Sequence, residues 1–365
     1  MIRGIAIFGA NGGGKSTLTH ALAKQTGYFE MDVEDYYFPE QQKSRKSVLE
    51  NDTVVDTEYL GELPYSKPRT KNEVQEAILQ DVKTHPKFIL AGVTMNWCDE
   101  IMDCIDIAFW VQTPLEKRLA RIQAREEKRF GARVLEGGDM FEQQKSFREV
   151  VQNRDPKVVE ECAVKFKCPV VVLDGTLPVQ ENVEKILVRL KVTIEKATMQ
   201  DLDAVEALYN DVCDYLADKE YNPGWRKGGF PARENALCFI EPGAMYVAKV
   251  DEKVVGSISL TFNPSAEIDE QSPDVEITQK DIMYIHIFTV HPGYQRYGIG
   301  SQLLDFAQKF AGNAGAKALQ LYVWEKNSVA IKAYEKKGFV CIGKDDIGLS
   351  EYGLDWFCLY EKEIR

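Results

Sequence analysis

Short apolar runs alternate with longer amphipathic segments through the first half of the chain. The runs are nearly continuous in apolar residues, which is typical of strands buried on both faces of a parallel sheet. They are Ile2–Phe8, Phe88–Val93, Ile105–Val111 and Val170–Leu173. Helical patterns follow them at Lys15–Gln25, Lys71–Thr84, Pro114–Lys128 and Pro178–Lys191. This order predicts a doubly wound α/β domain with a parallel sheet over residues 1–190.

A second order of elements begins with a short expected strand at Val192–Lys196, which predicts another domain over residues 191–365. Thr198 is expected to cap the next helix, with Asp201 completing a variant capping box. The polar stretch over 263–281 is expected to be a loop. The other expected elements are a hairpin of Met245–Val250 and Val254–Phe262, helices at Gly300–Ala311 and Ser328–Lys336, and strands at Met283–Val290, Ala318–Val323, Phe339–Gly343 and Trp356–Glu361.

The length and net charge of the chain limit the classes of protein to which it can belong. A chain of 365 residues suits two domains. Its net charge of −12 disfavours binding to nucleic acid or to an anionic membrane surface. The first fifteen residues enter a strand at once, so no signal peptide is expected, and no apolar run approaches the ~20 residues of a membrane span. Eight cysteines without a C-x-x-C pair, beside four histidines, predict no zinc site and a cytoplasmic location. The sequence does not indicate an oligomeric state.

The segment Gly9–Ser16 fits the pattern G-x-x-x-x-G-K-[ST] between an expected strand and an expected helix. Its glycines let successive N–H groups turn inward around a phosphate, and the helix adds the positive end of its dipole. Lys15 would reach the β- and γ-phosphates, and Ser16 would ligate Mg²⁺. The expected ATP-binding residues of this loop are Gly9, Asn11, Gly12, Gly13, Gly14, Lys15, Ser16 and Thr17. The alternative is a glycine-rich turn that binds nothing.

Two further groups of residues bear on phosphate chemistry. Four arginines form a stripe on one helix face, and two of them, Arg121 and Arg125, are expected to contact ATP. The alternative is a solvated face paired with neighbouring glutamates. Asp32 and Asp35 follow the expected strand Tyr28–Met31, where Asp32 would meet Mg²⁺ and either carboxylate would accept a hydroxyl proton. Turn and cap aspartates are the alternative here. The stripe comprises Arg118, Arg121, Arg125 and Arg129, and the glutamates are Glu116, Glu126 and Glu127.

Together the glycine loop, the stretch Asp32–Tyr37 and the arginine helix resemble the small-molecule P-loop kinases, which include the adenylate, shikimate and uridine kinase-like enzymes. The resemblance covers about residues 1–190. It implies a P-loop NTPase domain with a five-stranded parallel sheet, ATP and Mg²⁺ as cofactors, and a mobile lid near Arg121–Met140. The run Phe88–Val93 ends without the aspartate of a Walker B strand, and no signature identifies the phosphoryl acceptor.

A second glycine loop lies in the other half. An expected strand ends at Val290, and Gln295-Arg296-Tyr297-Gly298-Ile299-Gly300 leads into a helix. Free backbone amides at a helix N-terminus form an anion site. This loop and the segment Asn327–Phe339 resemble the GNAT acetyltransferases, over essentially all of 192–365. The resemblance implies a mixed-sheet α/β fold and acetyl-CoA as cofactor. The residues expected to contact acetyl-CoA are Phe288, Thr289, Val290, Gln295, Arg296, Tyr297, Gly298, Ile299, Gly300, Ser301 and Asn327.

The same resemblance implies that the strand before the loop separates from its neighbouring strand. The backbone of Phe288–Val290 would then pair with the pantetheine arm of the cofactor. It also implies that Tyr334 protonates the leaving thiolate, although a tyrosine at this position also suits a core. His286 is two residues before Phe288, shares its expected face, and is the first candidate for general base, with Glu325 as the second. A buried structural histidine is the alternative. Trp225 and Phe230 lie in the loop expected to contact the acceptor amine, or else pack at the surface.

These expectations combine into a bifunctional enzyme, in which an N-acetyltransferase for a small-molecule or peptide amine is fused to an ATP-dependent small-molecule kinase. The alternative is an acetyltransferase whose first domain binds a nucleotide and regulates transfer without kinase activity. Neither acceptor is identified by the sequence, since GNAT folds serve many amines.

Overall fold

The computed structural model describes residues 2–50, 63–262 and 281–364. Its contacts divide the chain into two compact units, Met1–Glu184 and Lys185–Arg365. The division falls inside one helix, α9 (Val179–Lys191), because Val188 near the end of this helix packs against the core of the second unit. The loop expected over 263–281 lies, except for its last residue, outside the described residues.

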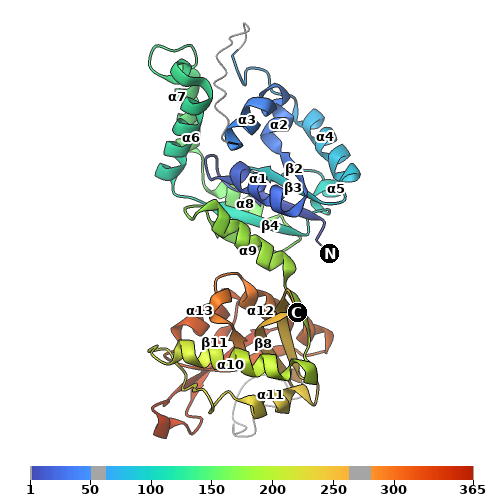
Figure 1. Ribbon diagram of the computed structural model, residues 1–365, viewed down its shortest axis with the longest axis vertical. Coiled ribbons are helices and arrows are strands. Elements are labelled where there is room, and N and C mark those ends of the chain that lie inside the picture. Colours follow the sequence, from blue (N-terminus) through green and yellow to red (C-terminus); the bar gives the residue numbers. More distant parts are fainter. Residues whose placement is uncertain (1, 51–62, 263–280, 365) are drawn as a thin grey trace. The chain divides into compact units, whose positions relative to one another are not determined.

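The first unit is built on a five-stranded sheet in the order β2-β3-β1-β4-β5, of which β2, β3 and β4 are labelled in Figure 1. Every pair of neighbouring strands in it is parallel, as the near-continuous apolar runs predicted. All residues of β1 and β3 are buried. The strands are β1 (Gly4–Phe8), β2 (Phe29–Asp32), β3 (Phe88–Gly92), β4 (Ile107–Gln112) and β5 (Val170–Asp174).

Helices pack on this sheet and extend beyond it. One face carries a core cluster in which Ala6 and Phe8 of β1 meet α4 and α8. The helix α1 contacts β1 and β3, and its Leu18 and Leu22 are buried. The helices are α1 (Lys15–Thr26), α2 (Val33–Tyr37), α3 (Gln42–Leu49), α4 (Lys71–Thr84), α5 (Asp99–Met102), α6 (Leu115–Phe130), α7 (Phe141–Asn153) and α8 (Lys157–Val164).

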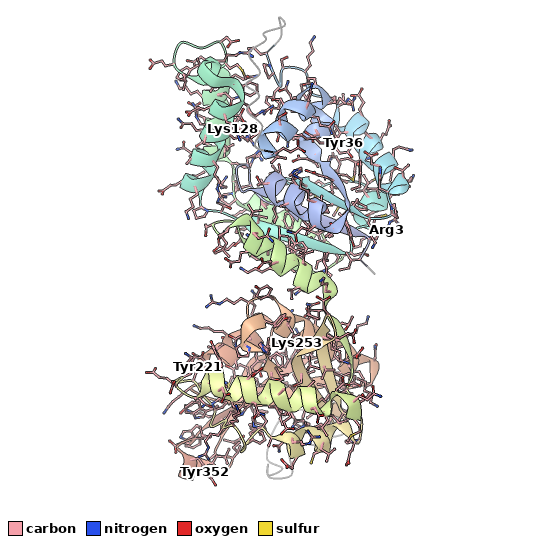
Figure 2. All side chains as sticks on the ribbon, in the orientation of Figure 1. Arg3, Tyr36, Lys128, Tyr221, Lys253 and Tyr352 are labelled. Atoms are coloured by element: carbon pink, nitrogen blue, oxygen red, sulfur yellow. The ribbon has the colours of Figure 1, made fainter. Side chains whose placement is uncertain are left out.

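Side-chain contacts fix the short helices that follow β2. The hydroxyl of Tyr36 on α2, labelled in Figure 2, donates to Asp81 of α4 at 2.5 Å. Thr70 and Glu73 form a capping box at the start of α4, which ends the exposed segment before it. The Tyr36–Asp81 hydrogen bond thus joins α4 to α2, which carries Asp35 and follows Asp32 at the end of β2.

The second unit is built on a seven-stranded mixed sheet in the order β11-β12-β10-β9-β8-β7-β6. Only β9 and β10 among these neighbours run parallel. The hairpin expected from the sequence is formed by β7 and β8, and its turn holds Asp251 and Glu252 at positive φ. The strands are β6 (Thr193–Lys196), β7 (Met245–Val250), β8 (Lys253–Thr261), β9 (Ile282–Val290), β10 (Ala318–Trp324), β11 (Val340–Asp345) and β12 (Phe357–Glu363).

Two helix layers cover the two faces of this sheet. A core cluster containing Ile258 and Ile285 packs with α12 and α13. On the other face Val247 and Val254 pack with α10 and α11. The capping box of Thr198 with Asp201 is present, as predicted. The helices are α10 (Leu202–Leu216), α11 (Arg233–Ile240), α12 (Ile299–Asn313) and α13 (Ser328–Lys336). In the part of the chain that the structure describes, no helix combines the length and apolar character of a membrane span.

Candidate functional sites

The first glycine loop connects β1 to α1. Gly9, Gly12 and Gly14 have positive φ angles of 145°, 75° and 95°, and Gly14 is the N-cap of α1. A Cβ on Gly12 would lie 2.5 Å from the carbonyl oxygen of Arg118, so the loop also needs glycine for space. The loop therefore has the backbone that exposes N–H groups beside the positive end of a 12-residue helix.

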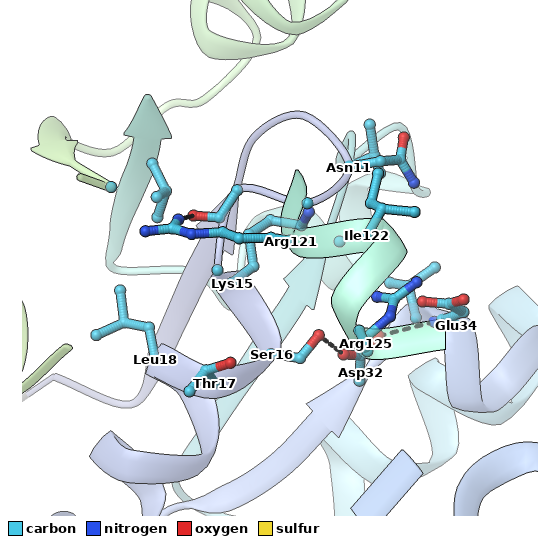
Figure 3. Close-up of a pocket in the computed structure, with 18 of the residues that line it drawn as sticks. Asn11, Lys15, Ser16, Thr17, Leu18, Asp32, Glu34, Arg121, Ile122 and Arg125 are labelled. Atoms are coloured by element: carbon cyan, nitrogen blue, oxygen red, sulfur yellow. Dashed lines mark hydrogen bonds between the residues drawn. The ribbon is translucent and has the colours of Figure 1, made fainter. Parts of the chain in front are cut away.

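This loop lines a cavity of about 1100 Å³. Lys15 is buried in its wall, and its Nζ donates to the carbonyl oxygen of Ala10 at 3.1 Å. Burial lowers the pKa of Lys15 to about 8, although the carboxylates of Asp32 and Glu34 oppose that shift. Figure 3 shows Lys15 and Ser16 of α1 together with Arg121 and Arg125 of α6 around this cavity. An anionic ligand would stabilise the charged form of Lys15, which burial disfavours.

Ser16 and Asp32 meet at one side of the cavity. The hydroxyl of Ser16 donates to Asp32 Oδ2 at 2.6 Å, drawn as a dashed line in Figure 3. Asp32 also caps α2, because its Oδ1 accepts from the N–H of Glu34 at 3.0 Å. Asp32 is therefore a helix cap, which was the alternative considered from the sequence. The cap uses Oδ1 of Asp32, whereas Ser16 donates to Oδ2.

A buried arginine that sequence reasoning missed joins the carboxylates after β2. Arg45 of α3 lies 2.7 Å from Asp32, 2.9 Å from Glu34 and 3.4 Å from Asp35. Burial raises the pKa of Asp35 to about 6, and the charges of Asp32 and Glu34 add to this while Arg45 opposes it. No local pattern marks Arg45, since its partners are about ten residues away along the chain.

The first two arginines of the α6 stripe reach the glycine loop. Arg118 Nη1 donates to the carbonyl oxygen of Asn11 at 3.3 Å. Arg121 Nη1 is 3.5 Å from the carbonyl oxygen of Gly13 and lines the cavity. The side chain of Asn11 itself accepts from Arg154 at 2.8 Å. Arg118 is half-buried and Arg121 is exposed, so the solvated-face alternative stays open at this end of the stripe.

The other two arginines are held by buried partners. Arg125 lines the cavity and pairs with Glu126 at 2.6 Å, and Glu126 is 2% exposed. Arg129 is 1% exposed and donates to Gln41 and Ser44, both at 3.2 Å. The segment expected as a lid thus begins as ordered helix with a buried cation. Its mobility stays a prediction.

The second glycine loop connects β9 to α12 through a short 3₁₀ turn, Pro292–Tyr294. Gly298 is the N-cap of α12 with a φ of 81°, and Arg296 has a φ of 66°. Gly300 leaves space for β9, because a Cβ there would lie 3.2 Å from the Phe288 ring and 3.4 Å from Val290. The loop presents the first amides of a 15-residue helix beside the end of β9.

The strands β9 and β10 separate beside this loop. They pair through three residues of each strand only, with Gln320 opposite Tyr284 as the last pair. Phe288–Val290 therefore lack a β10 partner, although β8 pairs with the opposite edge of β9. The backbone of a strand that has lost one neighbour can accept an extended ligand as a substitute. The geometry implied by the resemblance is present in these strands.

A β-bulge in β9 places the side chain of His286 on the opposite face of the sheet from the one predicted. Thr289 pairs with Ser257 and His286 pairs with Ser259, so two residues of β9 lie opposite one residue of β8. Ile287 in this bulge has a φ of 39°. The extra residue reverses the alternation of faces, and the expectation that His286 shares the face of Phe288 is wrong.

The contacts of His286 and Phe288 show that their side chains lie on opposite faces of the sheet. His286 stacks on Phe239 of α11 at 5.2 Å between ring centroids, and its Nε2 lies 2.8 Å from the hydroxyl of Thr261. Phe288 packs in the core cluster of α12 and α13, with its ring centroid 6.0 Å from that of Tyr334. His286 therefore lies on the face covered by α10 and α11.

Tyr334 is buried on α13, on the face of Phe288. Burial raises the pKa of its hydroxyl, so the phenol stays protonated at neutral pH. Asn327 is the N-cap of α13, and its side chain accepts from the N–H of Ala330 at 3.2 Å. Thr289 is buried too, with its hydroxyl 2.7 Å from that of Ser257. The side chains of Asn327 and Thr289 thus have structural partners.

The other candidates differ in exposure. Trp225 packs against the α10 and α11 core, while Phe230 is 47% exposed and touches Trp225 edge-on at 6.2 Å. Trp225 is therefore packed, as the alternative to an acceptor contact expects. Glu325 forms an ion pair with Lys344, which makes it a weaker base candidate than His286. Over the described ranges, no three His, Cys, Asp or Glu side chains gather into a group able to hold a metal ion.

A known family matches part of the second unit. Residues 207–339 match the Acetyltransferase (GNAT) family, and the match includes both segments that carried the resemblance. The second unit therefore contains a GNAT acetyltransferase domain.

Individual proteins resemble parts of the chain. An uncharacterised protein, YqaC, of Bacillus subtilis (strain 168) is 27% identical over 195 residues, which are 51% of this chain and 97% of that protein. The mycothiol acetyltransferase of Cellulomonas flavigena is 27% identical over 108 residues, or 30% of this chain and 29% of that protein. A GNAT-family acetyltransferase structure from Streptococcus pneumoniae has 24% identity over 48% of this chain and 99% of that chain, with a TM-score of 0.37.

Proposed function

We propose that this protein is a bifunctional enzyme, with an acetyl-CoA-dependent N-acetyltransferase in residues 191–365 and an ATP- and Mg²⁺-dependent small-molecule kinase in residues 1–190. The observation that carries the acetyltransferase is the separation of β9 from β10 beside the glycine-capped start of α12. The observation that carries the kinase is the buried Lys15 in a cavity lined by a glycine loop.

In the proposed acetyltransferase, acetyl-CoA takes the place of the missing neighbour of β9. The backbone of Phe288–Val290 would pair with the amide groups of the pantetheine arm. Amides between Gln295 and Ser301 would bind the pyrophosphate at the positive end of α12. The thioester would then reach the gap where the strands part, with Tyr334 on the face of the sheet that carries Phe288.

The chemical step requires one proton to leave the amine and one to reach the leaving thiolate. The amine nitrogen attacks the thioester carbonyl carbon, and the carbon–sulfur bond then breaks. Tyr334, protonated because it is buried, would supply the proton to sulfur. His286 on the opposite face would accept the proton of the amine, directly or through water. The acceptor, a small-molecule or peptide amine, would therefore enter from the side of α10 and α11, where Trp225 and Phe230 lie.

In the proposed kinase, the glycine loop and Lys15 would bind the phosphates of ATP, and Arg121 and Arg125 would neutralise the group in transfer. The oxygens of Ser16 and Asp32 are hard donors that suit Mg²⁺. The ion would be held there mainly through Ser16 and the phosphates, because Arg45 already neutralises Asp32. Mg²⁺ would supply charge neutralisation of the phosphates. Asp35 would accept the hydroxyl proton of the acceptor, since its raised pKa favours proton transfer near neutral pH.

A regulatory role of the first domain is the second candidate. It is favoured by the end of β3 at Gly92, where a Walker B strand would carry an aspartate, and by the ion pair that Arg45 forms with Asp32. In that role ATP would bind without phosphoryl transfer and would change acetyl transfer.

A metabolite screen with the full chain tests both proposals. The protein is incubated with acetyl-CoA, ATP and Mg²⁺, and products that gain an acetyl or a phosphoryl group are identified by mass spectrometry. We expect acetylated amines that disappear with Gly298→Glu, and phosphorylated products that disappear with Lys15→Ala. Acetylation that persists in Gly298→Glu contradicts the acetyltransferase site. An effect of ATP on acetylation without any phosphorylated product would favour regulation.

A further inference from the structure

A buried arginine lies against the start of α12. Arg189 comes from the last turn of α9, within the second unit, and is 7% exposed. Its Nη1 donates to the carbonyl oxygen of Gly298 at 3.1 Å. A Cβ on Gly298 would lie 2.6 Å from the same nitrogen. The guanidinium therefore lies in van der Waals contact with the residue that caps the helix.

This end of a helix is unfavourable for a cation alone. The first turn of α12 carries the positive end of the helix dipole, which attracts anions and repels Arg189. Burial adds a desolvation cost. The Nε of Arg189 is buried without a hydrogen-bond partner among the described residues. Asp305 on α12 attracts the guanidinium, but its carboxylate forms an ion pair with Lys337.

An anion in contact with both the guanidinium and the helix start would remove this conflict. It would accept hydrogen bonds from the unpartnered Nε–H and from the amides of the loop. A phosphate has the geometry for this, because the planar fork of arginine matches its oxygens and each charge-assisted bond is stronger than a neutral one. Gly298 has no side chain, which lets the guanidinium lie directly against the helix start.

We propose that Arg189 is a phosphate-binding residue of the acetyl-CoA site, contributed by the helix that precedes the acetyltransferase strands. The inference rests on the proposed acetyltransferase function, and it adds a side chain to a site otherwise made of backbone amides. The group bound is one of the CoA phosphates, either the pyrophosphate or the 3′-phosphate. The guanidinium contacts the helix start, and its Nε–H lacks a hydrogen-bond partner among the described residues. This combination favours a phosphate over the uncharged pantetheine arm.

The competing explanation is structural: Arg189 would only attach α9 to α12 through the Gly298 carbonyl. The two explanations differ in what they predict for ligands. A phosphate-binding arginine affects the affinity of ligands that contain the phosphate and no others. A structural arginine affects stability, and then all ligands of the site alike.

The test is calorimetric titration of the full-length protein with CoA, dephospho-CoA and pantetheine. The variants are Arg189→Gln, which removes the charge, and Arg189→Lys, which keeps the charge without the fork. Lys191→Gln is the matched control, because Lys191 is on the same helix and forms an exposed ion pair with Asp251. Thermal midpoints without ligand are measured for every variant, and Arg189→Lys provides the comparison if Arg189→Gln does not fold.

We expect Arg189→Gln to weaken CoA about 10- to 100-fold, Arg189→Lys to weaken it less, and Lys191→Gln to leave it unchanged. Pantetheine should bind the wild type and Arg189→Gln alike. Equal loss for CoA and dephospho-CoA supports the pyrophosphate, and a loss confined to CoA supports the 3′-phosphate. Unchanged CoA affinity in Arg189→Gln, or an equal loss for pantetheine, overturns the proposal while the acetyltransferase stands. If the wild type binds no CoA at all, the proposed function itself fails.

Discussion

The two glycine loops of this chain share one local design and differ in what surrounds them. Each loop joins a buried strand to a long helix, and each helix is capped by a glycine with positive φ, 95° at Gly14 and 81° at Gly298. Both therefore turn free amides toward the positive end of a helix dipole. The same backbone physics supports the proposal that both loops bind anions.

The two loops differ in the residues and strands that surround them. The first loop lines a cavity of about 1100 Å³ with Lys15, Arg121 and Arg125 in its wall. The second loop has one buried arginine, Arg189, and lies beside a strand that lacks a partner. Several cations suit a phosphoryl group whose charge shifts during transfer. One cation and an unpaired strand suit a cofactor whose phosphates only anchor it. The comparison thus supports the proposal that the first site reacts on phosphate while the second only holds it.

The largest effect is expected from a substitution in the second glycine loop. Gly298→Glu places a side chain at a positive φ and a negative charge beside the phosphates, and like charges in contact cost several kcal/mol. We expect acetyl-CoA affinity to fall about 1000-fold. Gly315→Glu is the control, because Gly315 also has a φ of 81° but no atom within 4 Å of its added Cβ. A similar loss in both variants, seen by calorimetry, would show that backbone strain alone is responsible.

The next effect separates anchoring from chemistry in the same domain. Tyr334→Phe removes the hydroxyl proposed to protonate the thiolate, so kcat for acetyl transfer should fall about 100-fold while the KM for acetyl-CoA changes little. Tyr360→Phe removes another buried hydroxyl, which donates to Glu335, and should leave kcat within a few-fold. Steady-state kinetics with a thiol reagent that detects free CoA measure both. A Tyr334→Phe enzyme with normal kcat would assign that hydroxyl a structural role.

A smaller effect tests whether the first loop depends on its side-chain cations. Lys15→Ala should weaken ATP binding about 10- to 100-fold, because a charge-assisted hydrogen bond is lost. Lys24→Ala changes an exposed lysine on the same helix and should leave ATP affinity unchanged. Fluorescence titration with a labelled ATP analogue compares the two. If both variants bind like the wild type, the loop does not hold the nucleotide.

The smallest expected effect concerns coupling of the two sites. If the two domains are separate enzymes, saturating ATP and Mg²⁺ should change kcat and KM for acetyl transfer less than about twofold, since reciprocal coupling of binding sites usually exceeds this factor when present. Acetyl transfer by the full chain is measured with and without ATP. A larger change that Lys15→Ala abolishes would favour the regulatory function over the kinase.

The sequence predicted the parallel sheet and the glycine loops because those features are local. Apolar runs such as Gly4–Phe8 and Phe88–Gly92 are continuous, and the glycines stand at fixed spacings. The helices α3, α7 and α8 were not predicted, because their segments are rich in charged residues and pack against distant partners. One example is the pairing of Arg45 on α3 with Asp32.

Two parts of the sites depend on tertiary structure and could not be read from local patterns. A period of two places His286 on the face of Phe288, but the bulge at Ile287 reverses it. Arg189 meets Gly298 more than one hundred residues later in the chain, so nothing near it marks its position. Residues whose role depends on a long-range contact are those that sequence reasoning missed.

The central claim is that one chain holds two separate phosphate sites, and the most direct test is a crossed titration. CoA contains an adenosine diphosphate moiety, so a single site that bound both ligands would be a real alternative. Full-length wild type, Lys15→Ala and Gly298→Glu are each titrated with ATP and with acetyl-CoA, in both orders. We expect the wild type to bind one of each without competition, and each variant to lose one ligand and keep the other. Competition between the ligands in the wild type, or loss of both ligands in a folded single variant, would contradict the claim.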